Sequence, residues 1–225
     1  IMLYYIRMRR LIISDLHIGS MFSKENDILR VLKNETYDEL ILAGDIIDFI
    51  RIPKFTKKSL DIFNYLINQE KPIIYIVGNH DIAFQDFINY DSSNIRFLKT
   101  YDFEDNNKKI RIEHGDDYDN FIIKWEQIMN IICFIANLIE RFLHLDISNY
   151  YEKYRSKQRN KINIQNILKK NTDIDIFIMG HTHKPEIIEN KINNKKLIYG
   201  NTGDWIQHKS YIILENGTIK LTNIE

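Results

Sequence analysis

The stretch RRLIISDLH, residues 9–17, decides the fold because it joins an apolar run to a polar turn that carries Asp15 and His17. The apolar residues 11–13 are typical of a buried strand that ends in a loop. The same arrangement recurs in ELILAGD (39–45), PIIYIVGNHD (72–81), KIRIEHGD (109–116), IDIFIMGHTH (174–183) and KLIYGNTGD (196–204). These runs predict a set of buried strands whose ends carry acidic, amide and imidazole groups.

Helical patterns over residues 26–32 and 59–68 separate the first three runs. The first half therefore predicts a βαβαβ arrangement with parallel strands, in which functional groups gather at the carboxyl ends. Asparagine pairs at 106–107 and 193–194 predict two hairpins, and residues 209–214 and 218–223, joined by ENG, predict a last hairpin that closes a sheet. We expect the second half to be antiparallel.

Residues 118–170 interrupt this pattern and predict a helical insertion in a single domain of residues 1–225. An apolar helical face, widened by further apolar residues between 131 and 138, supports this interpretation. Its members are Ile128, Ile132, Ile135, Ile139 and Phe142.

Composition excludes several classes of protein. Lys plus Arg equals Asp plus Glu, 31 against 31, so no overall charge attracts a polyanion and long nucleic acid is not an expected partner. The one cysteine, Cys133, fits a reducing cytoplasm. The first residues reach charged positions too early for a secretory signal, and the longest apolar stretch, at 131–143, is interrupted too early to span a membrane. We expect a cytoplasmic protein, in peripheral contact with the membrane at most.

The ends of the predicted strands share one kind of chemistry. Carboxylate, imidazole and amide oxygen are ligands for divalent ions, and Asp45 is placed to bridge two of them. The set predicts a two-metal centre: Asp15 and His17, Asp45 and Asp48, Asn79, His80 and Asp81, His114 and Asp116, His181 and His183.

Spacing suggests how these ligands are aimed. Residues i and i+2 share a face of a strand, so Asp15 with His17, and His181 with His183, are each expected to point as a pair into one pocket. Glycines flank the ligands where the backbone turns tightly or approaches the metals: Gly44, Gly78, Gly115 and Gly180.

The ordered motifs D-x-H, G-D-x-x-D, G-N-H-D, H-G-D and G-H-T-H resemble the calcineurin-like metallophosphoesterase superfamily from Asp15 to His183. The resemblance implies an α/β fold, a two-sheet sandwich with flanking helices and a helical insertion, and a phosphoester hydrolase with two divalent ions. Manganese is favoured, with iron, zinc, cobalt or nickel as alternatives. By the resemblance, Asp15, His17, Asp45 and His183 hold one ion, and Asp45, Asn79, His114 and His181 hold the other. A hydroxide between the ions would attack phosphorus without a covalent intermediate.

The same resemblance gives His80 a catalytic role, either in contact with the phosphoryl group or as the acid that protonates the leaving oxygen. Asp48 is predicted to orient His80, with a strand-end cap as the alternative. For Asp81 and Asp116, helix caps or partners of the ligands are the expected roles rather than metal ligands.

A narrower resemblance rests on HGDDYD (114–119), the insertion, GHTHKPE (180–186) and NTGDW (201–205). These are similar to the UDP-2,3-diacylglucosamine diphosphatase group of lipid A synthesis, whose insertion forms a lid over acyl chains. Protein Ser/Thr phosphatases usually read G-D-x-x-D-R-G and G-N-H-E, which this chain does not.

The narrower resemblance predicts three substrate-binding residues: Trp125, Arg155 in the basic run 153–161, and Trp205. Each has a structural alternative. The apolar arc 125–145 would instead pack in the core or at a dimer interface, and the basic run would form a solvated helix face. Trp205 would instead fill the core. This chain departs from the group at one position. Many members carry Arg at the position of His80, so a substrate other than the named lipid stays an alternative.

Two other functions remain as alternatives. A generic phosphodiesterase or nuclease acting on nucleotides would use the same metals. A non-catalytic interaction module would keep the fold, but the complete ligand set argues against it.

Overall fold

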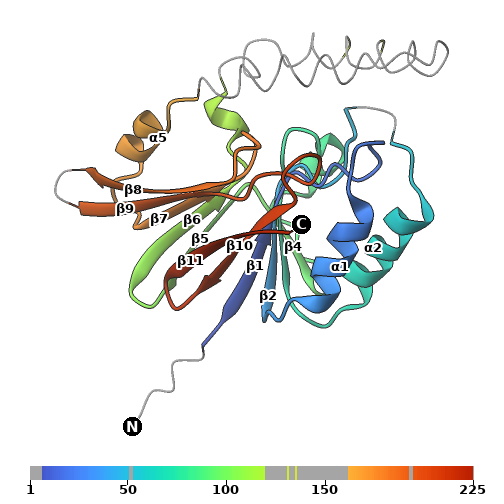
Figure 1. Cartoon of the computed structure of the whole chain (residues 1–225), viewed down its shortest axis with the longest axis horizontal. Helices are drawn as coiled ribbons and strands as arrows, with labels where there is room; N and C mark the ends of the chain where they lie inside the picture. Colours follow the sequence, from blue (N-terminus) through green and yellow to red (C-terminus); the bar gives the residue numbers. More distant parts are fainter. Residues whose placement is uncertain are drawn as a thin grey trace.

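The structure, a computed structural model, describes residues 7–50, 53–119, 131, 135, 162–192 and 195–224. Within these residues one six-stranded sheet has the order β11-β10-β1-β2-β3-β4 (Figure 1). Strands β1 to β4 are mutually parallel, and β10 pairs with β1 antiparallel. The strands are β1 (Arg9–Ile13), β2 (Glu39–Ala43), β3 (Ile73–Ile76), β4 (Ile95–Leu98), β10 (Ser210–Glu215) and β11 (Thr218–Asn223).

A second sheet in the described part of the chain has five strands in the order β5-β6-β7-β9-β8. The predicted hairpins β5–β6 and β8–β9 are antiparallel, but β7 runs parallel to both β6 and β9. The prediction of an antiparallel second half was therefore wrong for β7, because the chain enters this strand from outside the sheet rather than through a hairpin. The strands are β5 (Thr100–Asp105), β6 (Lys108–Glu113), β7 (Ile176–Met179), β8 (Glu186–Ile192) and β9 (Lys195–Asn201).

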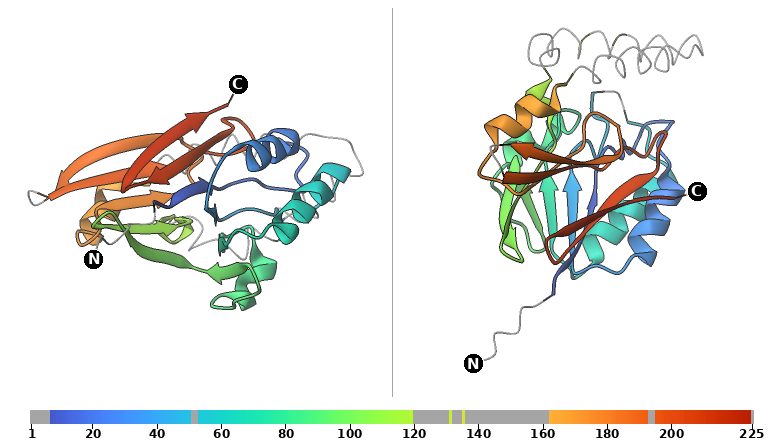
Figure 2. Two further views of the ribbon diagram at one scale, coloured as in Figure 1. Left: turned by 90° about the horizontal axis from the view of Figure 1, so that it is seen from below. Right: turned by 60° about the vertical axis from the view of Figure 1, so that its left-hand side comes forward.

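The two sheets pack face to face with helices on their outer faces, as Figures 1 and 2 show. Helices α1 (Glu25–Asn34) and α2 (Lys57–Asn68) cover the first sheet, and α5 (Ile164–Lys170) covers the second. Three buried apolar clusters correspond to these layers. One lies between α1, α2 and the first sheet, one between the sheets, and one under α5. The α/β sandwich predicted from the sequence is confirmed.

The helices α1 and α2 match the patterns at 26–32 and 59–68, and the last hairpin forms β10 and β11 as predicted. Strand β4 was missed because it is short and lies at the edge of the sheet, with only Leu98 buried. The predicted helical insertion, residues 118–170, includes α5, and within it Ile131 and Ile135 are helical and exposed. Most of the apolar arc and the basic run fall outside the described residues. No helix among the described residues is long and apolar enough to cross a membrane.

The side chain of Arg10 links the two sheets at the end remote from the polar loops. Its Nε donates to Glu39 Oε2 on β2 at 2.7 Å, and its Nη1 lies 3.6 Å from Asp105 Oδ1 on β5. The guanidinium carbon also lies 4.4 Å from the centre of the Phe103 ring. Both members of the Arg10–Glu39 pair are 8% exposed, so water screens the pair weakly.

We predict that Arg10→Ala lowers the free energy of unfolding by about 3–5 kcal/mol, because it leaves the Glu39 carboxylate buried without its cation. Urea denaturation followed by circular dichroism measures the change. The control is Lys196→Ala, which removes an exposed ion pair with Glu189 and should change stability little. Equal effects of the two substitutions would contradict a special role for Arg10.

Candidate metal centre

The polar loops meet because each follows a parallel strand. Asp15 and His17 follow β1, Asp45 and Asp48 follow β2, Asn79 and His80 follow β3, His114 follows β6, and His181 and His183 follow β7. The carboxyl ends of these strands lie at one edge of the sandwich, as expected for a parallel α/β arrangement. Both sheets therefore contribute ligands to one site.

Backbone conformation, rather than strand alternation, aims the ligands. Asp15, His17, Asp45, His181 and His183 all have positive φ, between 47° and 60°, in the left-handed region that non-glycine residues seldom adopt. The prediction that i and i+2 point together because they share a strand face was therefore wrong in its reason. It holds in outcome for Asp15 and His17, whereas His181 and His183 join different groups.

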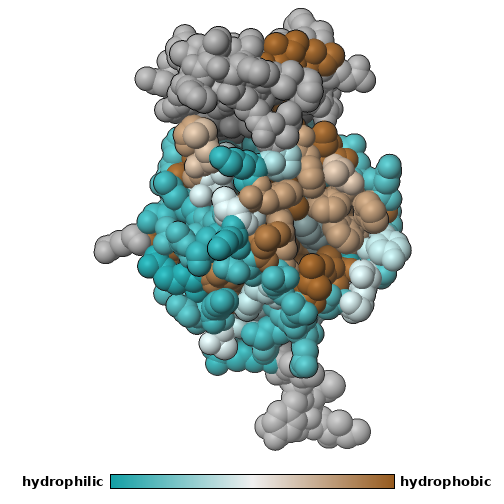
Figure 3. All heavy atoms as spheres, turned by 90° about the vertical axis from the view of Figure 1, so that its right-hand side faces the viewer, coloured by the Kyte–Doolittle hydropathy of each residue, from teal (hydrophilic) through white to brown (hydrophobic). Residues whose placement is uncertain are grey.

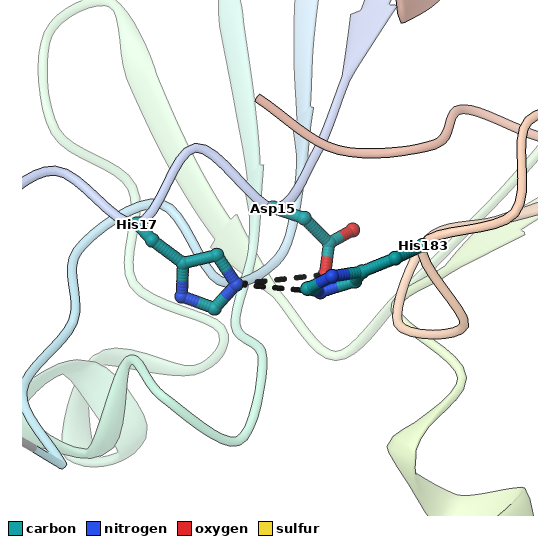
Figure 4. Close-up of side chains that lie close together, drawn as sticks. All are labelled: Asp15, His17 and His183. Atoms are coloured by element: carbon teal, nitrogen blue, oxygen red, sulfur yellow. Dashed lines mark hydrogen bonds and ion pairs between the residues drawn. The ribbon is translucent and has the colours of Figure 1, made fainter. Parts of the chain in front are cut away.

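The first group consists of Asp15, His17 and His183 (Figure 4). His183 Nε2 lies 3.0 Å from Asp15 Oδ1, and His17 Nε2 lies 4.0 Å from the same oxygen. The two imidazole Nε2 atoms are 3.4 Å apart. Three ligand atoms from two sheets thus converge on one point.

The second group consists of Asp45, His114 and His181. His114 Nε2 lies 3.2 Å from Asp45 Oδ2. The backbone N–H of His80 donates to the other oxygen, Asp45 Oδ1, at 2.8 Å. Asn79, the amide ligand expected here, is 6% exposed.

Buried polar atoms that lack a hydrogen-bond partner indicate whether the site suits a cation. Buried polar atoms are normally hydrogen-bonded, and leaving one unsatisfied is costly. Among the described residues, four predicted ligand atoms are buried without a hydrogen-bond partner: Asp15 Oδ1, Asn79 Oδ1, His114 Nε2 and His181 Nδ1. Two of them, Asp15 Oδ1 and His114 Nε2, lie in ion pairs with His183 and Asp45. A carboxylate oxygen, an amide oxygen and two imidazole nitrogens form a donor set that suits borderline divalent ions. The residues fit the metals that the family resemblance implies.

Neighbouring groups hold two of the histidines from behind. His114 Nδ1 lies 3.0 Å from the carbonyl oxygen of Ala43, and this contact leaves Nε2 toward Asp45. His181 Nε2 lies 3.1 Å from Asp119 Oδ2, and this contact leaves Nδ1 toward the group. Asp119 was missed in the sequence, where it lies inside HGDDYD but had no signal that separated it from Asp116 and Asp117.

Charges in the site shift its pKa values in ways that bear on metal binding. Burial opposes ionisation of Asp15, but the His183 imidazole lowers the pKa of this carboxyl to about 2. Burial lowers the pKa of His17 to about 4 and also lowers the pKa of His181. Burial acts in the same direction on His114, but the Asp45 carboxylate overrides it and raises the pKa to about 10. Near pH 7, His17 and His181 thus offer neutral nitrogens, while a cation at His114 would replace a proton.

His80 belongs to neither of these two groups but forms a third with His17 and Asp48, in which the ligand atoms also lie within 4.8 Å of one another. Its Nδ1 is 2.9 Å from Asp48 Oδ1, and its Nε2 is 3.9 Å from Asp45 Oδ2. The ring meets His17 edge-on, with centroids 4.7 Å apart. The contact with Asp48 is the one predicted, and it leaves Nε2 directed toward the site.

Asp81 and Asp116 support the site from outside. Asp81 accepts the backbone N–H groups of Ile46 and Ile47 at 3.0 and 2.9 Å, so it shapes the turn that carries Asp45. Asp116 pairs with Lys99 Nζ at 2.9 Å. Neither side chain caps the short 3-10 helix beside it, η1 (Ile82–Phe87) or η2 (Asp116–Tyr118).

Of the three residues predicted to bind substrate, the structure describes Trp205. Trp205 is fully buried and stacks on Tyr211, so the structure favours core packing over a pocket wall. Its backbone N–H donates to Asp15 O at 3.1 Å, so it supports a ligand instead. Trp125 and Arg155 lie outside the described residues.

Comparison with known proteins gives one family and two curated relatives. The family model described as calcineurin-like phosphoesterase matches residues 8–185. A UDP-2,3-diacylglucosamine hydrolase of Psychromonas ingrahamii is 24% identical, with 95% of this chain and 96% of that protein covered. A protein of the same name from Vibrio atlanticus is 26% identical, with 97% and 98% covered. Among solved structures, a novel archaeal phosphodiesterase is similar, with a TM-score of 0.49, 14% identity, and 96% and 100% of the two chains covered.

We predict that manganese added to chelator-treated protein raises the melting temperature, because the ion would bind buried ligand atoms that have no hydrogen-bond partner. The expected stabilisation is about 2.7 kcal/mol when the metal concentration is 100 times its Kd. His114→Ala should lose most of this increase. The control His208→Ala should keep it, since His208 pairs with Asp204 outside both groups. Differential scanning fluorimetry provides the measurement, and an unchanged wild-type melting temperature would contradict the assignment.

Proposed function

The chain belongs to the calcineurin-like phosphoesterase family and is a hydrolase of phosphoester bonds, and we propose that it cleaves the diphosphate of UDP-2,3-diacylglucosamine or a close analogue. The observation that carries the reaction class is the meeting of ligand side chains from both sheets in two groups, Asp15, His17 and His183 in one and Asp45, His114 and His181 in the other. Support for the substrate comes from the two relatives of that name, which align over nearly their whole length.

The predicted ligands form two sets, one for each cation. Asp15, His17 and His183 would hold one ion and Asn79, His114 and His181 the other, with Asp45 between them. The chemistry that bound divalent ions supply in such sites is activation of water and neutralisation of charge on phosphoryl oxygens. We propose manganese as the ion, because a mixed oxygen and nitrogen donor set accepts it readily.

His80 is the group in this site best placed to transfer a proton. Asp48 fixes its Nδ1 side, so its Nε2 faces the same space as the Asp45 carboxylate. An imidazole in this position can contact the phosphoryl group or donate a proton to the oxygen that leaves phosphorus. Asp48 would then act through His80 by keeping the ring oriented.

Apolar side chains exposed beside the site suit a substrate that carries acyl chains. Phe55 precedes α2 and is 45% exposed, and Ile82 and Phe87 at the two ends of η1 are 38% and 44% exposed. Figure 3 shows that apolar side chains gather into a patch on the face it draws. Exposed lysines flank Phe55 at positions 54, 57 and 58. Apolar and cationic groups together support our proposal of peripheral contact with a membrane surface.

We predict that manganese-loaded protein releases UMP from UDP-2,3-diacylglucosamine presented in detergent micelles, faster than it cleaves bis-p-nitrophenyl phosphate. Chromatography of UMP and absorbance of nitrophenol measure the two rates. Asn79→Ala should abolish both, because it removes a predicted ligand. Cleavage of the diester alone would reject this substrate and keep the hydrolase, whereas the absence of both activities would reject the whole proposal.

We also predict that His80→Ala lowers kcat by about 10²–10⁴-fold on a phosphodiester with an alkyl leaving group, which needs a proton to depart; this is the usual contribution of a general acid. The loss should be much smaller on p-nitrophenyl esters, because nitrophenolate leaves without a proton. Asp48→Asn should change both rates in the same direction but less. If His80→Ala instead slows both substrates equally, the imidazole contacts the phosphoryl group and does not protonate the leaving oxygen.

A further inference from the structure

We propose that Asp119 is a positioning residue that sets the orientation and tautomer of His181, so that Nδ1 of this imidazole is the atom offered to the metal. The inference rests on the metal centre of the proposed function and is independent of the substrate. Nothing in the five sequence motifs assigns a role to Asp119.

Asp119 is itself held in place. It follows η2 directly, and its backbone N–H donates to Asp116 O at 3.0 Å. Asp119 is 3% exposed and His181 is 2% exposed, and Oδ2 of the carboxylate lies 3.1 Å from Nε2 of the imidazole. A contact between two buried groups at this distance is a hydrogen bond that water does not weaken.

This hydrogen bond determines which nitrogen of His181 is free. A neutral imidazole carries one proton, and a carboxylate accepts hydrogen bonds but donates none. Facing Asp119, Nε2 must therefore carry the proton, which leaves a lone pair on Nδ1. That nitrogen is buried without a partner, in the group that His181 forms with Asp45 and His114, whose ligand atoms lie within 4.8 Å of one another. Without Asp119, the other tautomer would place an N–H group where a cation belongs.

His181 also connects the two ligand groups. Its backbone N–H donates to Asp15 Oδ2 at 3.0 Å, while its side chain belongs to the group of Asp45. The other orienting contacts use different partners, Ala43 O for His114 and Asp48 for His80. Loss of the Asp119 carboxylate should therefore weaken the second group and leave the first group of Asp15, His17 and His183 able to bind.

The test uses the full-length protein and Co²⁺ as the probe, with no substrate present. Visible absorption during Co²⁺ titration reports the ligand field, and atomic emission after dialysis reports the metal content. For Asp119→Ala we expect about 10–100-fold weaker binding at one site, as is typical when a partner of a ligand is removed. Asp119→Asn should recover part of this loss, because its amide oxygen can still accept from Nε2. The control is Asp117→Asn, an exposed carboxyl two residues away, which should leave the titration unchanged.

The outcomes separate this inference from the proposed function. A wild-type protein that binds no Co²⁺ would reject the metal centre and the inference with it. Normal binding by the wild type and by Asp119→Ala alike would overturn the role of Asp119 only. If Asp119→Ala fails to fold by circular dichroism, Asp119→Leu decides, because leucine has a similar size and cannot accept a hydrogen bond from Nε2. An unchanged spectrum and affinity in that variant would also overturn the proposal.

Discussion

One hydrogen bond between the two sheets underlies the site: the backbone N–H of His181, after β7, donates to the carboxylate of Asp15, after β1. A second connection joins His114, after β6, to the carbonyl of Ala43 on β2. The ligands can meet only if the sheets keep their spacing, which the apolar cluster between them maintains. Glycines permit this close approach, because a side chain on Gly180 would collide with Asp15 and one on Gly44 with His114. The position of the metal centre is therefore a consequence of how the sandwich packs.

The same packing raises the free energy of the folded protein when no cation is bound. Burying an unsatisfied polar atom typically costs about 1–3 kcal/mol, and Asn79 Oδ1 and His181 Nδ1 are buried here without a hydrogen-bond partner. Left-handed backbone at Asp15, His17, Asp45, His181 and His183 adds strain of the kind found where structure serves function. Hydrogen bonds from outside, such as those that Asp81 accepts from the turn after Asp45, hold this arrangement against its cost. A bound divalent ion would offset the free-energy cost of these buried polar atoms and of the strained backbone.

The parts of the structure that the sequence predicts are those with local signals. Apolar runs that end in glycine and polar residues located β1, β2, β3, β6, β7 and β9, and the spacing of the histidines and carboxylates located their ligands. Strand β4 lacked such a signal, because it has only four residues and is followed by Lys99 and Thr100 rather than by a glycine-bearing turn. The direction of β7 and the partner of His181 depend on residues far apart in the chain, and no local pattern contains them. Trp205 shows a further limit of prediction from sequence. An aromatic residue next to a site has the same sequence signature whether it lines the pocket or fills the core.

His80 carries the remaining chemical question, because many members of the diphosphatase group resembled by this chain have Arg at that position. A guanidinium stays charged at any physiological pH, so it can neutralise a phosphoryl group but cannot transfer a proton. An imidazole can do either, and Asp48 here orients it as it would orient a proton donor. Where those members have a guanidinium of fixed charge, this chain thus has a group that can either contact the phosphoryl oxygens or protonate the leaving oxygen. We therefore expect the change at this one position to alter substrate preference rather than the class of reaction.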